Sequence, residues 1–565
     1  MGRIFFTLLL AVGAISSPTC RGPTVHIRNG TLVGSAHDHI DSFYGIPYVE
    51  PPIGDLRLRA PQPLNKSFGL LQLTNNLRDV AACVQMDQSQ VLTEGLTTPV
   101  IDVLNGIGGN FTGKSGEDCL TINVQRPSGV PRHRKLPVLF WIYGGGWELG
   151  TTQLYDASAI VQKSEAMGEP VIFVAPNYRV NAYGFLNGKE IQEAGVSNLG
   201  LRDQRKALEW VAENIEAFGG DPDRVTIWGE SAGAVSVFDH MIVNNGDHKY
   251  KGKPLFRGAI MNSGTFVNTL DTANPKPQRA FDTFARNAGC DPSKLREKTI
   301  NCLRRVQPKT YQAAMNSLPN FSGPNSNDLA YIRRVDPSSS FLGNEPEDAL
   351  RTGQFAHVPI ITGNMQDEAT IFAVSSRNLI HSTESLVSYF TSWFPDAPRG
   401  LISKFIATYP DKLSAGLPAG TGNKFEIYPQ FKRNAAIQTD VTFEGGRRVV
   451  LQYLSKVVPT WSYIATFLHL DPQLAQVGTY HTSDLGTQFY LSNPTAGNNM
   501  NEAYIRFVND LDPNGRSSEN VWWPKWDQKT RQLANFSNTA VNLAKDDYRQ
   551  ESLAFLAKYG SQLRQ

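Results

Sequence analysis

The amino-acid sequence predicts an α/β fold, with a large, mostly parallel central sheet flanked by helices. Two patterns support this prediction. Continuous apolar runs, which are typical of strands buried on both faces, alternate along the chain with segments of helical periodicity. In addition, a serine flanked by glycines stands where one such strand meets a helix. Because no linker, repeat or low-complexity segment divides residues 18–565, we expect one large domain with long insertions.

The first clear buried strand covers residues 136–143 and runs directly into Gly144-Gly145-Gly146-Trp147. A glycine run at the end of a buried strand lets backbone N–H groups approach a substrate with no Cβ in the way. Taken alone, a triple glycine is also typical of a flexible loop. Its interpretation therefore depends on the rest of the chain.

A helix and a second buried strand follow. Apolar side chains at helical spacing predict a helix that ends at Gly219-Gly220. Residues 224–228 are rich in β-branched and aromatic side chains and predict the strand, and residues 234–238 can begin the next helix. The apolar residues of the first helix are Leu208, Val211, Ala212, Ile215 and Phe218.

Between that strand and the next helix stands Gly229-Glu230-Ser231-Ala232-Gly233. In this setting G-x-S-x-G is the nucleophile elbow of α/β-hydrolases, a strained turn that points the serine Oγ out of the sheet. Both glycines are required because these positions lie against neighbouring backbone. The sequence thus predicts an α/β-hydrolase fold and a nucleophilic Ser231, in preference to a structural turn serine. Combined with the elbow, the triple glycine predicts an oxyanion hole.

A nucleophilic serine needs a base, and the base needs an acid that orients it. In this fold the acid and then the histidine follow the serine, each on a loop after a strand. A predicted strand at 357–364 opens into Asp367-Glu368, and a loop after a predicted strand at 461–469 contains His481. His481 is the better candidate base, because two other histidines lie at the ends of these strands. They are His357 and His469.

Further motifs occur in order along nearly the whole chain, and several independent motifs are more specific than any one of them. Together they resemble the type-B carboxylesterase and lipase family, which includes cholinesterases and secreted fungal lipases. The motifs are Phe43-Tyr44-Gly45-Ile46-Pro47-Tyr48, residues 51–57, 115–120, 144–146, 177–180 and 198–204, the elbow, Asp367-Glu368 and residues 478–481.

The resemblance implies that Ser231 is the nucleophile, Glu368 the acid and His481 the base. It assigns the oxyanion hole to three N–H groups, those of Gly145, Gly146 and Ala232. The family usually has Phe after the triple glycine, so Trp147 leaves the size of the substrate open. The resemblance also implies internal ion pairs, and we interpret Glu230 and Asp367 as structural. The ion pairs are Arg57 with Glu117 and Arg179 with Asp203.

The implied chemistry is two-step acyl transfer through an acyl-serine, which needs no cofactor and no metal. The sequence contains no C-x-x-C pair and no H-E-x-x-H motif that would indicate zinc. With 54 basic and 52 acidic residues, the net charge argues against a nucleic-acid partner. Some relatives are inactive adhesion or scaffold proteins that have lost the serine or the histidine. This chain keeps all three triad positions, which favours an enzyme.

The substrate class depends on the segment between Cys83 and Cys119, which the resemblance implies is a disulfide-stapled loop near the active-site mouth. Cholinesterases carry a tryptophan here that holds a quaternary ammonium, whereas the only aromatic residue of this loop is Phe111. An aliphatic flap resembles the lids of fungal lipases and predicts lipophilic esters and a lipid interface as partners. The alternative is a flap that is simply packed down, in a non-lipolytic carboxylesterase acting on small or aryl esters. The aliphatic residues are Val91, Leu92, Leu96, Val100, Ile101, Val103 and Leu104.

A secreted chain passes through an oxidising environment, so its five cysteines predict two disulfides and one remaining thiol. Cys290 and Cys302 are close enough in sequence to close a small loop, and the resemblance implies the pair Cys83–Cys119. Cys20 is the odd one, either lost with a signal peptide or retained as a free thiol.

The amino terminus predicts secretion. Arg3 followed by the apolar residues 4–14 is typical of a signal peptide, which we place at residues 1–17. No later run reaches the roughly 18 apolar residues of a membrane span, so no transmembrane anchor is expected. In a secreted chain most glycosylation sequons would lie on surface loops. They occur at Asn29, Asn65, Asn110, Asn320 and Asn535.

Overall fold

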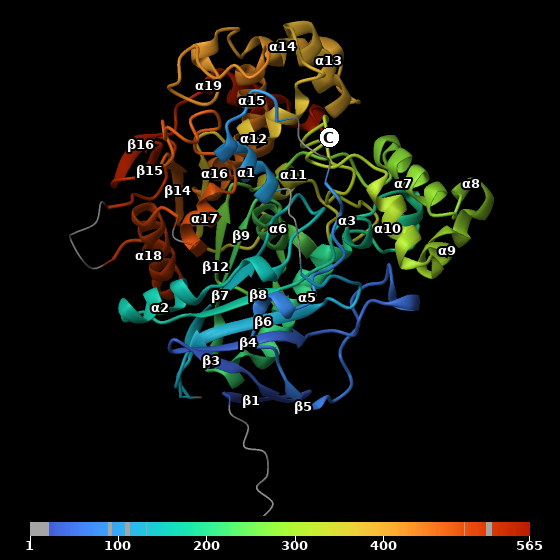
Figure 1. The fold of residues 1–565 in the computed structure, drawn as a ribbon, viewed down its shortest axis with the longest axis vertical. Helices are drawn as coiled ribbons and strands as arrows, with labels where there is room; N and C mark the ends of the chain where they lie inside the picture. Colours follow the sequence, from blue (N-terminus) through green and yellow to red (C-terminus); the bar gives the residue numbers. More distant parts are fainter. Residues whose placement is uncertain (1–21, 89–92, 108–112, 132, 491, 516–521) are drawn as a thin grey trace, which may run out of the picture.

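The predicted α/β fold is confirmed by a computed structural model, which describes residues 22–88, 93–107, 113–131, 133–490, 492–515 and 522–565 (Figure 1). Eleven strands of these residues form one sheet, in the order β16-β15-β14-β13-β12-β9-β7-β8-β6-β4-β3. Its central strands are parallel: β8 (Ile172–Pro176), β7 (Leu136–Ile142), β9 (Gly220–Glu230), β12 (Gly258–Asn262), β13 (Ile360–Met365), β14 (Thr460–Ala465) and β15 (Gln532–Phe536).

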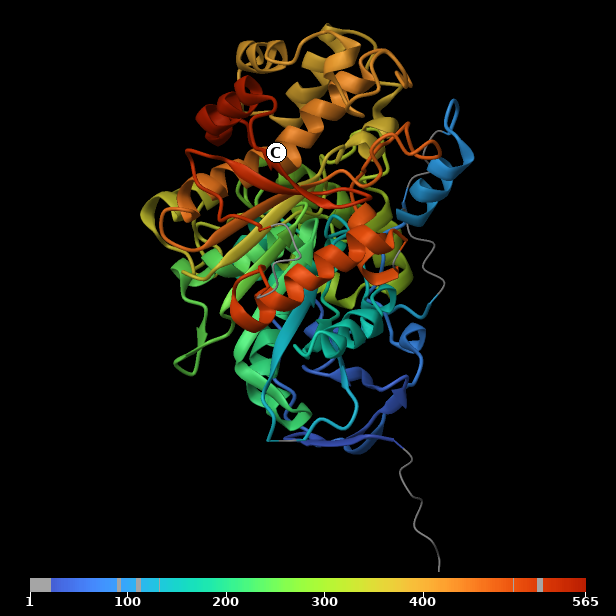
Figure 2. The same cartoon turned by 90° about the vertical axis from the view of Figure 1, so that its left-hand side faces the viewer.

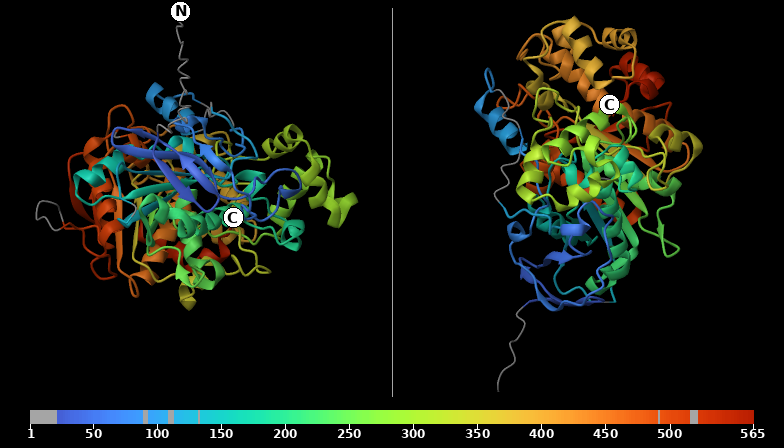
Figure 3. Two further views of the ribbon diagram at one scale, coloured as in Figure 1. Left: turned by 90° about the horizontal axis from the view of Figure 1, so that it is seen from below. Right: turned by 90° about the vertical axis from the view of Figure 1, so that its right-hand side faces the viewer.

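Antiparallel strands complete both edges of this sheet. They are β3 (Ser35–His37), β4 (Ile40–Pro47) and β6 (Thr121–Pro127) at one edge, and β16 (Val541–Lys545) at the other. A separate small sheet of β1 (Thr24–Ile27), β2 (Gly30–Val33) and β5 (Gly69–Gln72) lies at the end of the molecule seen from below in Figure 3. A short hairpin, β10 (Lys249–Tyr250) and β11 (Lys253–Pro254), stands apart.

The sequence of the central strands explains why they lie in the middle. Every residue of β7 is buried, as expected for an apolar run covered on both faces. Trp141 of β7 pairs in register with Trp228 of β9, and their rings lie 4.3 Å apart. Trp228 directly precedes Gly229, so this aromatic pair packs beneath the turn that follows β9.

Helices cover both faces of the sheet. On one face α18 (Pro494–Asp510) packs on β7 and β9, next to α2 (Ser158–Ala166) and α17 (Ser483–Tyr490). On the other, α6 (Ala232–Ile242) packs on β9 and β12, beside α5 (Leu199–Asn214) and α11 (Pro346–Thr352), with α16 (Gly445–Leu454) against α11. The predicted helix that ends at Gly219 corresponds to α5 and a 3₁₀ turn, Ile215–Phe218, with Gly219 at φ 82°.

Insertions form the periphery. One group lies at the right of Figure 1: α7 (Pro275–Asn287), α8 (Pro292–Leu295), α9 (Thr299–Arg305) and α10 (Pro308–Asn316). Another lies at the top of Figure 1: α12 (Thr370–Ala373), α13 (Thr383–Trp393), α14 (Arg399–Ala407), α15 (Phe431–Thr439) and α19 (Gln550–Tyr559). Short helices α3 (Asn181–Gly184) and α4 (Lys189–Glu193) precede α5. Within the described residues, no helix is long and apolar enough to cross a membrane.

Candidate active site

Ser231 occupies the turn between β9 and α6. Its backbone has φ 56° and ψ −128°, a conformation that residues with a Cβ rarely adopt. The flanking glycines are sterically required: a Cβ on Gly229 would lie 2.4 Å from the carbonyl oxygen of Gly233, and a Cβ on Gly233 would lie 2.0 Å from that of Ile142. The turn is therefore as tight as the G-x-S-x-G pattern predicts.

Ser231, His481 and Glu368 form one continuous hydrogen-bonded row. Nε2 of His481 lies 2.7 Å from Oγ of Ser231, and Nδ1 lies 2.6 Å from Oε2 of Glu368. The second oxygen of Glu368 accepts the backbone N–H of Met365 at 2.7 Å, which fixes the carboxylate. Both His481 and Glu368 are buried, at 2% and 0% exposed. An imidazole held in this way can remove a proton from the serine hydroxyl.

The sheet brings these three residues together. Ser231 follows β9, Glu368 follows β13, and His481 lies on the loop after β14. β12 pairs with both β9 and β13, and β13 pairs with β14, all in parallel, so the carboxyl ends of these strands meet at one edge. The backbone N–H of His481 also donates to the carbonyl oxygen of Glu368 at 3.2 Å. By contrast, His357 and His469 are exposed.

The triple glycine forms a turn against the elbow. Gly145 and Gly146 have φ values of 99° and 62°, and the carbonyl oxygen of Gly145 accepts the N–H groups of Glu148 and Leu149 at 3.0 and 3.1 Å. A Cβ on Gly144 would lie 2.8 Å from Cβ of Ser231. Gly145 and Gly146 line the same cavity as Ser231 and Ala232.

That cavity has a volume of about 430 Å³ and an apolar lining. Phe372 and Phe443 stand over His481, with ring centres 5.2 and 4.6 Å from the imidazole. Trp147 also lines the cavity, and its indole N–H donates to Oγ of Ser236 at 3.3 Å. A phenylalanine could not make that bond, so the tryptophan is fixed by a polar contact as well as by packing.

Two further carboxyls lie close to the row. Glu230 is 3.3 Å from Nε2 of His481 through Oε1, and burial raises its pKa well above the usual value, with Asp484 and Glu368 adding to the effect. Asp367 accepts the backbone N–H groups of Ala419 and Thr479 at 2.7 and 2.9 Å. Burial raises the pKa of Asp367 to about 7. Asp367 thus pins the loop that carries His481.

The predicted flap contains a helix that the sequence interpretation did not anticipate, α1 (Thr98–Ile107). Val100 and Leu104, one turn apart, are buried, whereas Val103 and Ile107 line the cavity. Figure 2 shows α1 as the blue helix at the right-hand edge, beside an orange loop. Gln476 of the loop before His481 holds this segment, because its amide nitrogen donates to the carbonyl oxygen of Gly95 and its oxygen accepts the N–H of Thr97. Val91, Leu92 and Phe111 lie outside the described residues.

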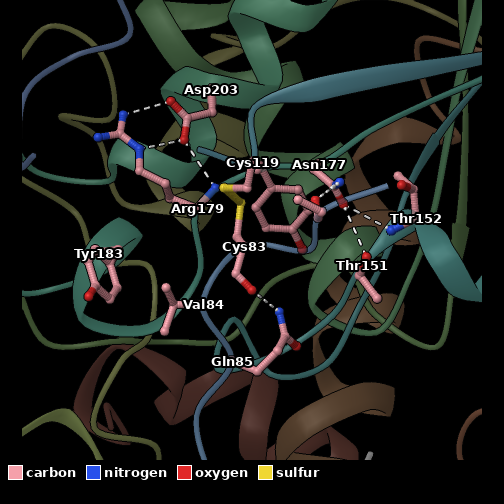
Figure 4. The surroundings of a disulfide bond; sticks show 12 residues. Cys83, Val84, Gln85, Cys119, Thr151, Thr152, Asn177, Arg179, Tyr183 and Asp203 are labelled. Carbon is pink, nitrogen blue, oxygen red and sulfur yellow. Dashed lines mark hydrogen bonds and ion pairs between the residues drawn. A yellow bond between two sulfur atoms is a disulfide. The ribbon is translucent and has the colours of Figure 1, made fainter. Parts of the chain in front are cut away.

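The flap is stapled at its base. The structure contains the disulfides Cys83–Cys119 and Cys290–Cys302, while Cys20 lies outside the described residues. Figure 4 shows the first beside the ion pair of Arg179 and Asp203, which are 2.7 Å apart. The second pair that the resemblance implies, Arg57 and Glu117, is 2.6 Å apart.

The sequons occupy different environments. Asn65 is exposed, Asn29 and Asn535 are half-buried, and Asn535 belongs to β15. Asn320 is only 6% exposed, and its amide donates to the carbonyl oxygen of Asp87. Asn320 is therefore not on an exposed loop, and it contacts Asp87 of the segment between Cys83 and Cys119. Asn110 and the predicted signal peptide, residues 1–17, lie outside the described residues.

Sequence reasoning missed most of the cavity lining. Phe372, Phe443, Asn327 and Gln565 belong to no motif, and only their position around the same cavity as Ser231 reveals them. Among the described residues, no group of His, Cys, Asp and Glu could hold a metal ion.

Comparisons with known proteins agree with this geometry. The carboxylesterase family model matches residues 21–556. A secreted triacylglycerol lipase (LIP1) of Gibberella zeae is 43% identical over 94% of this chain and 90% of its own length. Lipase 1 of Geotrichum candidum is 36% identical over 97% of each chain. The solved structure of Aspergillus niger EstA superposes with a TM-score of 0.79 at 27% identity, covering 96% of this chain and 99% of that one.

Proposed function

Because this chain belongs to the carboxylesterase family and is therefore a carboxylic ester hydrolase, we propose that it is a secreted lipase that works through an acyl-enzyme on Ser231. The main support for the catalytic assignment is the hydrogen-bonded row of Ser231, His481 and Glu368. The two nitrogens of His481 lie 2.7 Å from Oγ of Ser231 and 2.6 Å from Oε2 of Glu368. The names of its relatives support lipophilic esters as the substrate class. The helix α1 over an apolar cavity agrees with a lid.

The proposed reaction has two symmetrical halves. His481 takes the proton of Ser231 as Oγ attacks the ester carbonyl carbon, and Glu368 stabilises the imidazolium. The N–H groups of Gly145, Gly146 and Ala232 hold the oxyanion. His481 then gives its proton to the leaving alcohol. Water, activated by the same imidazole, attacks the acyl-serine and releases the acid.

The decisive experiment compares emulsified triacylglycerol with a soluble short-chain p-nitrophenyl ester. We expect the wild-type protein to hydrolyse both and Ser231→Ala to hydrolyse neither, with loss of labelling by a fluorophosphonate probe. An active Ser231→Ala protein would reject the catalytic assignment.

The lid is tested by Ile107→Ser, with Asn105→Ser on the exposed side of α1 as the control. An open lid exposes apolar area at about 25 cal/mol per Å², a cost that is offset only when lipid covers it. We expect Ile107→Ser to slow hydrolysis of the emulsion by about tenfold and to spare the soluble ester. Equal losses on both would instead favour a non-lipolytic carboxylesterase.

A further inference from the structure

Several polar atoms in the wall of the active-site cavity have no hydrogen-bond partner. Within the described part of the chain, the amide nitrogens of Asn327 and Gln565 and the hydroxyl of Ser263 are buried, line this cavity and are unpaired. Asn327 is 8% exposed, Gln565 3% and Ser263 0%. The hydroxyl of Thr442, which lines the same cavity, is also buried and unpaired.

These groups stand on well-fixed backbone. The N–H of Gln565 donates to the carbonyl oxygen of Asn268, and its own carbonyl oxygen accepts from Arg334 at 2.6 Å and from the N–H of Leu270 at 2.8 Å. The hydroxyl of Ser326, next to Asn327, bonds Gln438 and the carbonyl oxygen of Phe372. The backbone of Gln565 and the residue before Asn327 are thus fixed, while the two side-chain amide nitrogens have no partner in the protein.

An unpaired amide in an apolar wall is costly. A buried donor without a partner loses about 1–3 kcal/mol, and ligand pockets use a few such groups among apolar side chains to fix orientation and specificity. A saturated hydrocarbon chain against these amides would leave that cost in place. A chain with an oxygen at this point would remove it.

The residues that line the cavity differ in exposure. Leu154 and Tyr490 line the cavity on its solvent side, with exposures of 41% and 60%. The alcohol leaves while the acyl group is still bonded to Ser231, so the alcohol must lie toward solvent. Asn327 and Gln565 are buried, so the acyl chain is the part of the substrate that would lie beside them.

We propose that this enzyme prefers esters whose acyl chain carries an oxygen function, such as a hydroxyl, epoxide or ketone, and that Asn327 and Gln565 donate hydrogen bonds to that oxygen. Ser263 and Thr442 supply further hydroxyls in the same wall. The inference rests on the proposed function of Ser231 and specifies the acid that the enzyme releases.

The test measures kcat/KM for p-nitrophenyl octadecanoate and for its counterparts with a mid-chain or terminal hydroxyl. Asn327→Leu and Gln565→Met keep the shape of each side chain and remove the amide. We expect the wild-type protein to favour a hydroxylated ester by about tenfold, the worth of one buried hydrogen bond. In each variant the ratio should fall toward one, chiefly because the saturated ester improves. Each ester is in the same physical state in every assay. A change in the ratio of the two kcat/KM values therefore comes from the cavity and not from the solubility of the ester.

Leu329→Met is the matched control, because it alters the same wall without changing its polarity. It should change both rates in parallel. The inference is overturned if the wild-type protein has no preference for a hydroxylated ester, or if both amide variants keep the wild-type ratio, as they would if the amides only bind water. If one variant fails to fold, as judged by circular dichroism, the other decides. Loss of activity on every ester in the wild-type protein would reject the proposed function itself.

Discussion

Three carboxyls lie near His481, and their environments differ. Glu368 bonds Nδ1 and the N–H of Met365. Burial raises the pKa of Glu230 well above its usual range and that of Asp484 to about 6. Burial therefore favours the neutral form of Glu230, although its Oε1 also lies 3.3 Å from Nε2 of the imidazole. The acid of a triad orients the imidazole from Nδ1, the nitrogen turned away from the serine, and Glu368 is the carboxyl bonded to that nitrogen.

This difference predicts the outcome of two matched substitutions. Glu368→Gln should lower kcat on a soluble ester by about 10³–10⁴-fold, because the orienting charge is lost. Glu230→Gln keeps the shape of a side chain whose neutral form is favoured by burial, and it should cost less than about tenfold. Steady-state kinetics on both purified variants will check this. A larger loss from Glu230→Gln than from Glu368→Gln would reverse the two roles.

At the scale of elements, the elbow depends on how closely α6 approaches β7. Gly233 is the second residue of α6, and Gly400 is the second residue of α14. A Cβ on Gly233 would meet the carbonyl oxygen of Ile142, whereas a Cβ on Gly400 would have nothing within 4 Å.

Alanine at these two positions should therefore have opposite effects. Gly400→Ala should stabilise the protein by about 0.5–1 kcal/mol, because alanine is the better helix former. Gly233→Ala should destabilise it by about 1–3 kcal/mol through the clash and should also lower esterase activity. Thermal unfolding of both variants gives the comparison. Equal shifts would mean that α6 can move away from β7.

The sequence predicted the strands and the elbow because both depend on local chemistry. Residues 224–228 and 136–143 are apolar enough to identify buried strands, and they became parts of β9 and β7. It did not predict α1. Some apolar residues of this helix pack inward and others line the cavity, so they do not form the single apolar stripe that indicates a helix. Cavity residues such as Gln565 were beyond sequence reasoning, since only tertiary packing places them near Ser231.

At the scale of the whole molecule, a buried charge cluster joins the carboxyl-terminal segment to the wall of the cavity. Arg447 lies 2.7 Å from both Glu444 and Asp546, and all three are almost fully buried. Glu444 ends the π-helical turn Asp440–Glu444, which also carries Phe443. Removing one partner of such a cluster leaves an uncompensated buried charge.

Acid should loosen this connection. Burial alone would raise the pKa of Glu444, but Arg447, Arg448 and Arg549 lower it to about 2. A lowered pKa in the folded state means that the stabilisation is complete above the usual carboxyl pKa and is lost as the pH falls toward 2.

Glu444→Gln should therefore be less stable at neutral pH, by about 3–5 kcal/mol. Its melting temperature should fall less steeply with acid than that of the wild-type protein. Melting curves recorded between neutral pH and pH 2 will measure the two slopes, with Glu216→Gln on the surface as the control. Parallel curves for Glu444→Gln and the wild-type protein would contradict this account.

The spacing of the triad in the sequence also determines when the site can become active during synthesis. Ser231 leaves the ribosome 250 residues before His481, and Glu368 comes 113 residues before it. Strand pairing of such long range is slow, because loop closure must precede the contacts that reward it. During that interval the elbow can form while its base is still absent. Until β13 and β14 have paired, Ser231 is present in the growing chain but has no base to activate it as a nucleophile.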